Sequence, residues 1–160
     1  MKSRTALPVD AADLRILGVL QEDASLAVGE VAERVHLSQN ACWRRIRRLD
    51  EDGLILRRVA LLDADRLEAG VTVFVTIRAA EHSDAWLAQF VDVVRRIPEI
   101  VEFYRMSGDI DYLMKLKVTD IAAYDAVYKR LIRGVRLSDV SSAFAMEELK
   151  HTTAIPLPSG

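Results

Sequence analysis

The sequence has few of the residues and motifs that secreted proteins use for disulfides or that enzymes use for catalysis. It holds one cysteine, 7 glycines and 4 prolines in 160 residues. One cysteine excludes an intramolecular disulfide framework and fits a reducing compartment. Three histidines (His36, His82 and His151) are scattered without metal-ligand spacing, and neither a glycine-rich phosphate loop nor a G-x-S-x-G motif is present. We therefore expect no enzyme activity, no metal site and no cofactor.

Long apolar runs and an excess of basic charge are absent as well. The start, MKSRTALPVDAADL, lacks the apolar core of a signal peptide, and no stretch approaches the roughly 20 apolar residues of a membrane span. The net charge is −2 and the pI is about 5.9, which argues against a wholly basic nucleic-acid binder but not against a local basic patch. We expect a cytoplasmic protein.

The first third of the chain carries the pattern of three short helices. After a loose arm at residues 1–9, Asp10 and Asp13 have the spacing of a capping pair, and the helix they open runs to about Glu22. A second helix is expected over Val28–Arg34, and Ser38 caps a third. Because only about three residues join the last two, the pattern predicts a helix-turn-helix.

The stretch from Ser38 to Leu56, SQNACWRRIRRLDEDGLIL, organises this region. Cys42, Ile46 and Leu49 recur at the helical period and predict a thin buried stripe. Gly53 ends the helix, and Leu56–Leu62 reads as a strand that serves as a wing or a connector.

Arginines crowd the opposite face of the third predicted helix. They either form a solvated face paired with Asp50, Glu51 and Asp52 or contact DNA, and the adjacent Asn40 and Trp43 favour DNA. Besides the capping residue Ser38, five side chains are expected at bases or nearby phosphates and three at backbone phosphates, whereas a structural salt bridge is at least as good an explanation for Arg45. The predicted DNA-binding residues are Ser38, Gln39, Asn40, Trp43, Arg44 and Arg47, with Arg48, Arg57 and Arg58 on phosphates.

The second half changes character after a boundary at residues 61–70. Alternating β-branched residues and capped amphipathic stretches predict a strand, a helix, two strands, a helix and a strand, which is a ferredoxin-like unit. We expect a helix-turn-helix domain at 1–55, a strand and linker at 56–70, the ferredoxin-like domain at 71–150 and a frayed tail at 151–160. The expected elements are Val71–Ala79, a helix from Ser83 that ends before Pro98, Ile100–Met106, Tyr112–Val118, a helix from Asp120 to about Arg133, and Val140–Leu149.

The turn SGDIDY, Ser107 to Tyr112, permits two interpretations. It is either a tight hairpin, with Gly108 in a conformation that other residues resist, or a small-molecule pocket. In the pocket, backbone amides hold a carboxylate and Asp111 holds an ammonium group, a combination that suits a free amino acid. The residues alone favour the hairpin.

The ordered set VDAADLRILGVLQEDA, LSQNACWRRIRRLDEDGLI, SGDIDYLMKLKV and FAMEELK resembles the Lrp/AsnC (feast/famine) regulators, most closely the DecR-type, cysteine-responsive subgroup. The resemblance implies an α+β protein with a winged helix-turn-helix and a C-terminal ferredoxin-like βαββαβ (RAM-type) domain. It also implies a homodimer that assembles to octamers and an amino-acid effector, L-cysteine, bound at the turn between subunits. The implied effector-binding residues are Met106, Gly108, Asp109, Asp111, Tyr112, Ser142 and Phe144. One departure is RGVRLSDV, which is one residue shorter than the Pro-Gly step usual at this loop.

The sequence is therefore interpreted as a DNA-binding transcriptional regulator that senses an amino acid. Its second domain is expected to dimerise through the sheet and to bury Val73, Val75 and the alternate faces of Tyr112–Val118 there. Two alternatives stay open: a metabolite-binding module without DNA binding, and a thiol-based redox switch at Cys42.

Overall fold

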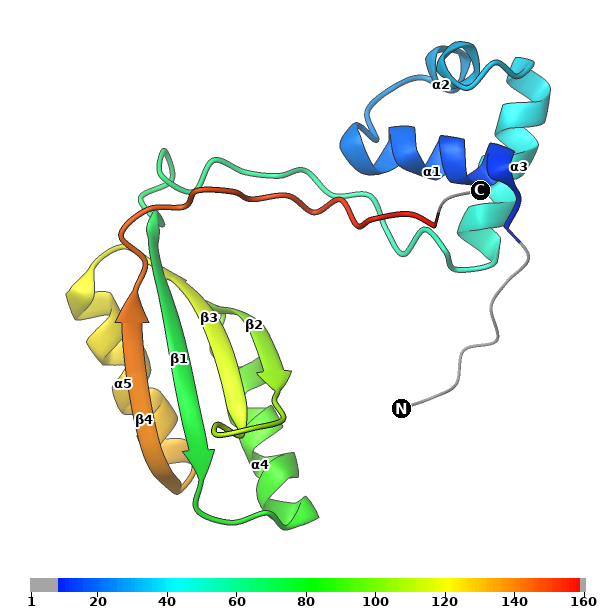
Figure 1. Ribbon diagram of the computed structural model, residues 1–160. Helices are drawn as coiled ribbons and strands as arrows, with labels where there is room; N and C mark the ends of the chain where they lie inside the picture. Colours follow the sequence, from blue (N-terminus) through cyan, green and yellow to red (C-terminus); the bar gives the residue numbers. More distant parts are fainter. Residues whose placement is uncertain (1–8, 159–160) are drawn as a thin grey trace. The chain divides into compact units, whose positions relative to one another are not determined.

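The computed structural model describes residues 9–158, so residues 1–8 of the expected loose arm and residues 159–160 of the tail lie outside the described part. The chain divides into two compact units. One combines the chain up to Leu61 with the chain from Lys150 onward, and the other is Leu62–Leu149 (Figure 1). Among the described residues, no helix has the length and apolar character needed to cross a membrane.

Three helices form the first unit: α1 (Ala11–Glu22), α2 (Val28–Arg34) and α3 (Gln39–Glu51). The predicted capping pair at α1 is confirmed, because the amide of Asp13 donates to Asp10 (2.9 Å) and the amide of Asp10 donates to Asp13 (3.1 Å). The hydroxyl of Ser38 accepts from the amide of Ala41 at the start of α3, as predicted. The three helices begin and end close to their expected bounds.

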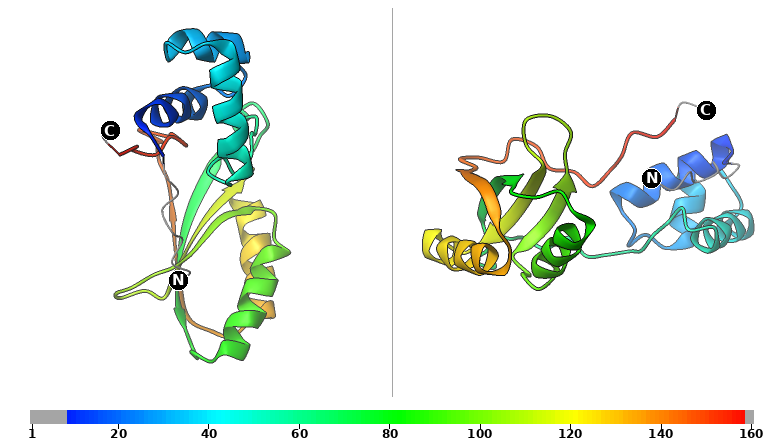
Figure 2. Two further views of the ribbon diagram at one scale, coloured as in Figure 1. Left: turned by 90° about the vertical axis from the view of Figure 1, so that its right-hand side faces the viewer. Right: turned by 90° about the horizontal axis from the view of Figure 1, so that it is seen from below.

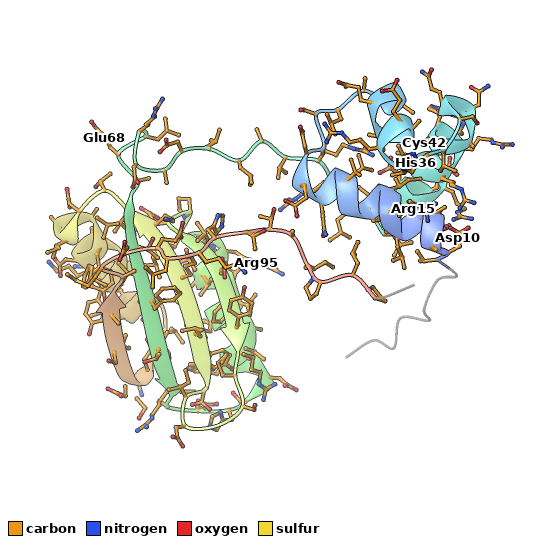
Figure 3. The ribbon with its side chains drawn as sticks, turned by 45° about the horizontal axis from the view of Figure 1, so that its top comes forward. Asp10, Arg15, His36, Cys42, Glu68 and Arg95 are labelled. Atoms are coloured by element: carbon orange, nitrogen blue, oxygen red, sulfur yellow. The ribbon has the colours of Figure 1, made fainter. Side chains whose placement is uncertain are left out.

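The turn between α2 and α3 is tight, and it places His36 in a left-handed conformation with φ 57°. Gly53, with φ 72°, ends α3 as predicted. Between the helices lies a small apolar core, in which Figure 3 shows the labelled Cys42. Its buried members are Ile16, Val31, Ala32, Val35, Cys42, Ile46 and Leu49, so the predicted stripe of α3 is confirmed.

The second unit is a four-stranded antiparallel sheet in the order β2-β3-β1-β4. Both helices cover one face of it (Figures 1 and 2), which gives the ferredoxin-like arrangement expected from the sequence. Its elements are β1 (Val71–Ala79), α4 (Asp84–Arg95), β2 (Ile100–Arg105), β3 (Tyr112–Val118), α5 (Ile121–Gly134) and β4 (Leu137–Phe144).

The positions of Val73 and Val75 on the helix-covered face of the sheet contradict the expectation that a dimer interface buries them. Val73 and Val75 are 0% and 2% exposed because they pack in the core of their own unit with Met114 and Leu116. They are therefore unavailable to a dimer partner. Strand residues alternate between faces, so a sheet-mediated dimer would use the opposite face, on which Phe74 is 39% exposed.

Two predicted strands also differ from the structure. Leu56–Leu62 pairs with no strand in the described chain, because apolar alternation favours an extended backbone but a strand also needs a neighbour. The last strand spans Leu137–Phe144 instead of Val140–Leu149, since its length is set by β1: Leu137 pairs with Ala79, and Phe144 with Val73.

The C-terminal segment is the third difference. The amide of Ile155 donates to the side-chain oxygen of Gln21 on α1 (3.1 Å), and Leu157 lies against α1 near Gly18. The expectation of a frayed tail is therefore wrong for this segment. The sequence signal for fraying was its proline content, but proline also holds a chain extended for docking.

The shortened loop leaves only Val135 and Arg136 between α5 and β4. Two α4 side chains bond to the backbone at this connection: Gln89 donates to the carbonyl of Gly134 at the end of α5 (2.8 Å) and the Trp86 indole donates to the carbonyl of Arg136 (2.9 Å). A Cβ at Gly134 would lie 2.7 Å from a methyl carbon of Val93. Glycine therefore permits the close approach of α5 to α4.

Two Gly→Ala substitutions should change stability in opposite directions. Gly18 is in the middle of α1, where a new Cβ would meet its nearest neighbour, Leu157, at an ordinary 3.8 Å. We expect Gly18→Ala to stabilise its unit by about 0.5–1 kcal/mol through helix propensity. Gly134→Ala should destabilise by about 1–3 kcal/mol through overpacking. Urea unfolding of each variant measures both effects, and a stabilising Gly134→Ala would contradict the close-approach explanation.

Candidate functional site

The side chains that the sequence analysis assigned to DNA lie on α3, at its cap and beyond its end, and those of Trp43, Arg44 and Arg47 lie on its outward face. All nine predicted DNA-binding residues are exposed, although the Ser38 hydroxyl also caps α3. Trp43 is 49% exposed, and the guanidinium carbon of Arg47 lies 5.5 Å from the centre of its ring. Arg47 also pairs with Glu51 one turn further on, at 2.7 Å. This indole thus faces solvent beneath a cation instead of packing into the helical core.

Arg44 differs from Arg47 on this face because its guanidinium has no ion-pair partner among the described residues. Its side chain is also exposed. Arg58 pairs with Asp50 at 3.0 Å beyond the end of α3, and Arg57 is exposed beside it. A free guanidinium offers its full set of donors to a guanine edge or a phosphate.

Two other arginines of α3 turn toward α1. Arg45 donates to Asp13 (2.8 Å) and to Asp10 (2.7 Å), and Arg48 also pairs with Asp13. The Asp13 side chain is fully buried, whereas those of Arg45 and Arg48 are 30% and 47% exposed. The salt-bridge explanation for Arg45 is confirmed, and Arg48 shares that carboxylate. Asp13 therefore joins α1 to α3 and fixes how α3 presents its outward face.

This arrangement changes the pKa of the Asp10 carboxyl. The hydrogen bond from the Asp13 amide, with the bond from Arg45, lowers the pKa of Asp10 from its ordinary 3.8 to about 2. Because the pKa of Asp10 is lower in the folded state, its ionised carboxylate stabilises the folded state at pH values above the ordinary pKa. This contribution to stability is lost as the pH falls from about 4 toward 2. Figure 3 shows Asp10 at the beginning of α1.

Cys42 lies within the helical core with 0% exposure, and burial raises the pKa of its thiol. Both observations disfavour the thiolate that redox chemistry requires. Within residues 9–158, no three His, Cys, Asp or Glu side chains gather where they could hold a metal ion.

The turn between β2 and β3 is a hairpin with Gly108 at φ 118°. The Met106 amide donates to the carbonyl of Asp111 (2.8 Å), and the Asp111 carboxylate accepts from the Ala79 amide at the end of β1 (2.8 Å). The turn is thereby tied to the neighbouring strand. One carboxylate oxygen of Asp111 is engaged, and the Met106 and Asp109 side chains are exposed.

The other predicted effector residues lie elsewhere in this unit. Tyr112 is 4% exposed and packs against Phe90 and Phe103, so its ring belongs to the core. Ser142 and Phe144 lie on β4 against Tyr124 of α5. The structure thus brings together Met106, Gly108, Asp109 and Asp111, but not the remaining three.

Arg78 is a candidate that the sequence analysis missed. It lies near the end of β1, is exposed, and donates from Nε to the carbonyl of Asp109 (2.9 Å). This brings a guanidinium to the turn, where it offers a partner for a ligand carboxylate. The available signal was one arginine in an otherwise apolar and hydroxyl-bearing strand, VTVFVTIRA.

Two family models match the chain. Residues 9–55 match a winged helix-turn-helix DNA-binding model, and residues 72–155 match the Lrp/AsnC ligand binding domain. The two matches correspond to the helical segment and to the sheet-containing segment with part of the tail.

Individual proteins match over nearly the whole chain. The glutamate uptake regulatory protein of Zymomonas mobilis is 54% identical over 94% of this chain and 92% of its own length. The DNA-binding transcriptional activator DecR of Escherichia coli is 45% identical over 93% and 99%. A transcriptional regulator from Neisseria meningitidis, solved as a complex with L-Met, is 33% identical, with a TM-score of 0.88 over 93% of this chain and 97% of its own.

Removal of the Asp13 charge should loosen α3. Asp13→Asn leaves two arginines facing a neutral group, and we expect a loss of about 2–4 kcal/mol in unfolding free energy. The matched control is Glu51→Gln, which breaks an exposed i,i+4 pair and should cost less than about 0.5 kcal/mol. Urea unfolding measures both, and equal losses would contradict the role assigned to Asp13.

Proposed function

Because this chain belongs to the Lrp/AsnC family of DNA-binding transcriptional regulators that respond to amino acids, we propose how it does so. The outward face of α3 reads an operator, and the turn Ser107–Tyr112 holds a free amino acid, L-cysteine. The observation that carries this proposal is the exposed set Trp43, Arg44 and Arg47 on a helix fixed from behind by Asp13. The site of action is the cytoplasm.

A fixed orientation of α3 matters because the recognition of bases depends on geometry. Bidentate contacts from arginine or asparagine to a base edge require the side chain to start from a fixed position in the groove. Arg44 and Asn40 are exposed near the N-terminal half of α3, the part of a recognition helix that meets base edges. Arg57 and Arg58 supply phosphate contacts, which add affinity without sequence information.

A homodimer supplies the second half-site. One short helix contacts too few base pairs for specificity, so two copies read a partly palindromic operator. We propose that the sheet face opposite the helices, with the exposed Phe74, joins the copies. Further assembly to an octamer follows the family resemblance.

The proposed effector site combines Arg78 with the turn. The Arg78 guanidinium and the backbone amides of the turn hold the effector carboxylate, and the free oxygen of Asp111 accepts from its ammonium group. The choice of L-cysteine rests on the likeness to DecR-type regulators. A bound effector changes operator affinity only by preferring one of two states of the assembly.

Substitution of one arginine on the outward face should weaken specific DNA binding. Arg44→Ala should cost about 1–3 kcal/mol of operator binding if Arg44 reads a base. Arg96→Ala is the control, because Arg96 is exposed, pairs with Asp92 and belongs to the other unit. Fluorescence anisotropy with the DNA upstream of the gene measures both variants.

A salt series on the same DNA separates the regulator from a metabolite-binding module without DNA binding. Phosphate neutralisation makes log affinity fall linearly with log salt. Salt-independent binding, or equal affinities for Arg44→Ala and the unmodified chain, would contradict the assignment of this face. Cys42→Ser should stay responsive to the effector, whereas loss of the response would favour the redox switch.

Calorimetry tests the effector site. We expect L-cysteine to bind the full chain, and Arg78→Met to weaken that binding by at least about tenfold through loss of one charge-assisted contact. Arg96→Met is the matched control. L-Glutamate and L-methionine complete the panel: heat with one of these alone would contradict cysteine, and no heat with any amino acid would contradict the pocket.

A further inference from the structure

An apolar groove of about 800 Å³ lies within the first unit. Leu14, Leu17 and Leu20 of α1 line it on one side, spaced so that they share a face of the helix that continues beyond the helical core. Leu54 and Leu56, which follow α3, line it as well. Arg57 and Arg58, to which the proposed function assigns phosphate contacts, also line the groove, but that function uses none of the leucines.

The C-terminal segment forms a further wall of this groove. Figures 1 and 2 show it, in red, beside α1. The amide of Ile155 donates to Gln21 (3.1 Å), and a methyl carbon of Leu157 lies 3.8 Å from the position that a Cβ at Gly18 would take. The missing side chain at Gly18 thus leaves room for Leu157 on the helix.

The segment AIPLP is suited to docking of this kind. Ile155 and Leu157 each precede a proline, which holds both residues in an extended conformation. Proline also restricts the undocked chain, so less conformational freedom is lost when the segment docks. Of the two apolar side chains, Leu157 is half-buried against α1, whereas Ile155 is 66% exposed at the rim of the groove.

This docking gives the DNA-binding unit two covalent connections to the effector-binding unit. The chain leaves the first unit after Leu61 and returns to it at Lys150, shortly after β4 ends at Phe144. We propose that the segment Thr153–Pro158 of each chain docks on α1 of the same chain, where it forms one wall of the groove, and that this second connection transmits the effector state from β4 to the DNA-binding unit. The inference rests on the proposed function for its effector, but the docking itself does not.

Cross-linking tests the docking without any effector. Gly18→Cys and Leu157→Cys are combined in the full chain and treated with a short bismaleimide, and the unmodified chain, whose Cys42 is buried, serves as the control. We expect a cross-link within one chain. A cross-link between two chains would overturn docking in the same chain, and none would overturn docking altogether.

The coupling is tested by the double variant Ile155→Asp, Leu157→Asp, which places two charges on the segment where it lines the groove. The matched control is Leu149→Asp, at an 86% exposed position outside the groove. Operator binding is measured by anisotropy with and without L-cysteine. We expect the ratio of the two affinities to fall to about one in the double variant and to stay unchanged in the control.

Several outcomes separate this inference from the proposed function. A double variant that keeps the unmodified chain's response overturns the inference, and so does a Leu149→Asp variant that loses it. If the double variant fails to fold by circular dichroism, Ile155→Ser with Leu157→Ser replaces it with the same expected result. An unmodified chain that binds the operator but ignores L-cysteine overturns that effector and the proposed transmission of its state, while the cross-link still decides the docking.

Discussion

The buried carboxylate of Asp13 is the constraint on which the DNA-binding unit depends. It lies on α1 with no exposed surface and accepts from Arg45 and Arg48 of α3. A charge in that position is costly unless it is paired, so separation of α1 from α3 leaves an uncompensated ion. The apolar core between the helices is small, and a thin stripe alone resists sliding poorly. The ion pairs fix the position of α3 against α1 and so hold the outward face of α3 in one orientation.

The same constraint divides the arginines of α3 into two groups. Arg45 and Arg48 are directed toward the acidic start of α1, whereas Arg44 and Arg47 stay on the outward face. A helix of 13 residues thereby uses one residue type both to fix itself and to present cations on its outward face. The division follows from helical geometry, because positions one and two apart do not share a face.

The second unit follows a different principle, in which strand register decides which residues meet. The β2–β3 turn is tied to the end of β1 by Asp111 and Arg78, so this turn joins three strands at one end of the sheet. β4 pairs with the other side of β1 and then leads to the C-terminal segment on α1. The strand to which the turn is tied, β1, therefore also pairs with the strand that continues toward the first unit.

The sequence by itself determined the elements of this protein, because caps, periodicity and glycine stops are local. Asp10, Ser38 and Gly53 marked the limits of helices, and the spacing of Cys42, Ile46 and Leu49 identified the buried stripe. Tertiary structure alone decided what depends on a neighbour. It moved Val73 and Val75 into the core, limited β4 to the length of β1, left residues 56–62 without a strand partner, brought Arg78 to the turn, and placed the C-terminal segment on α1. Pairing and docking join residues distant in the chain, and no local pattern records which partner a residue meets.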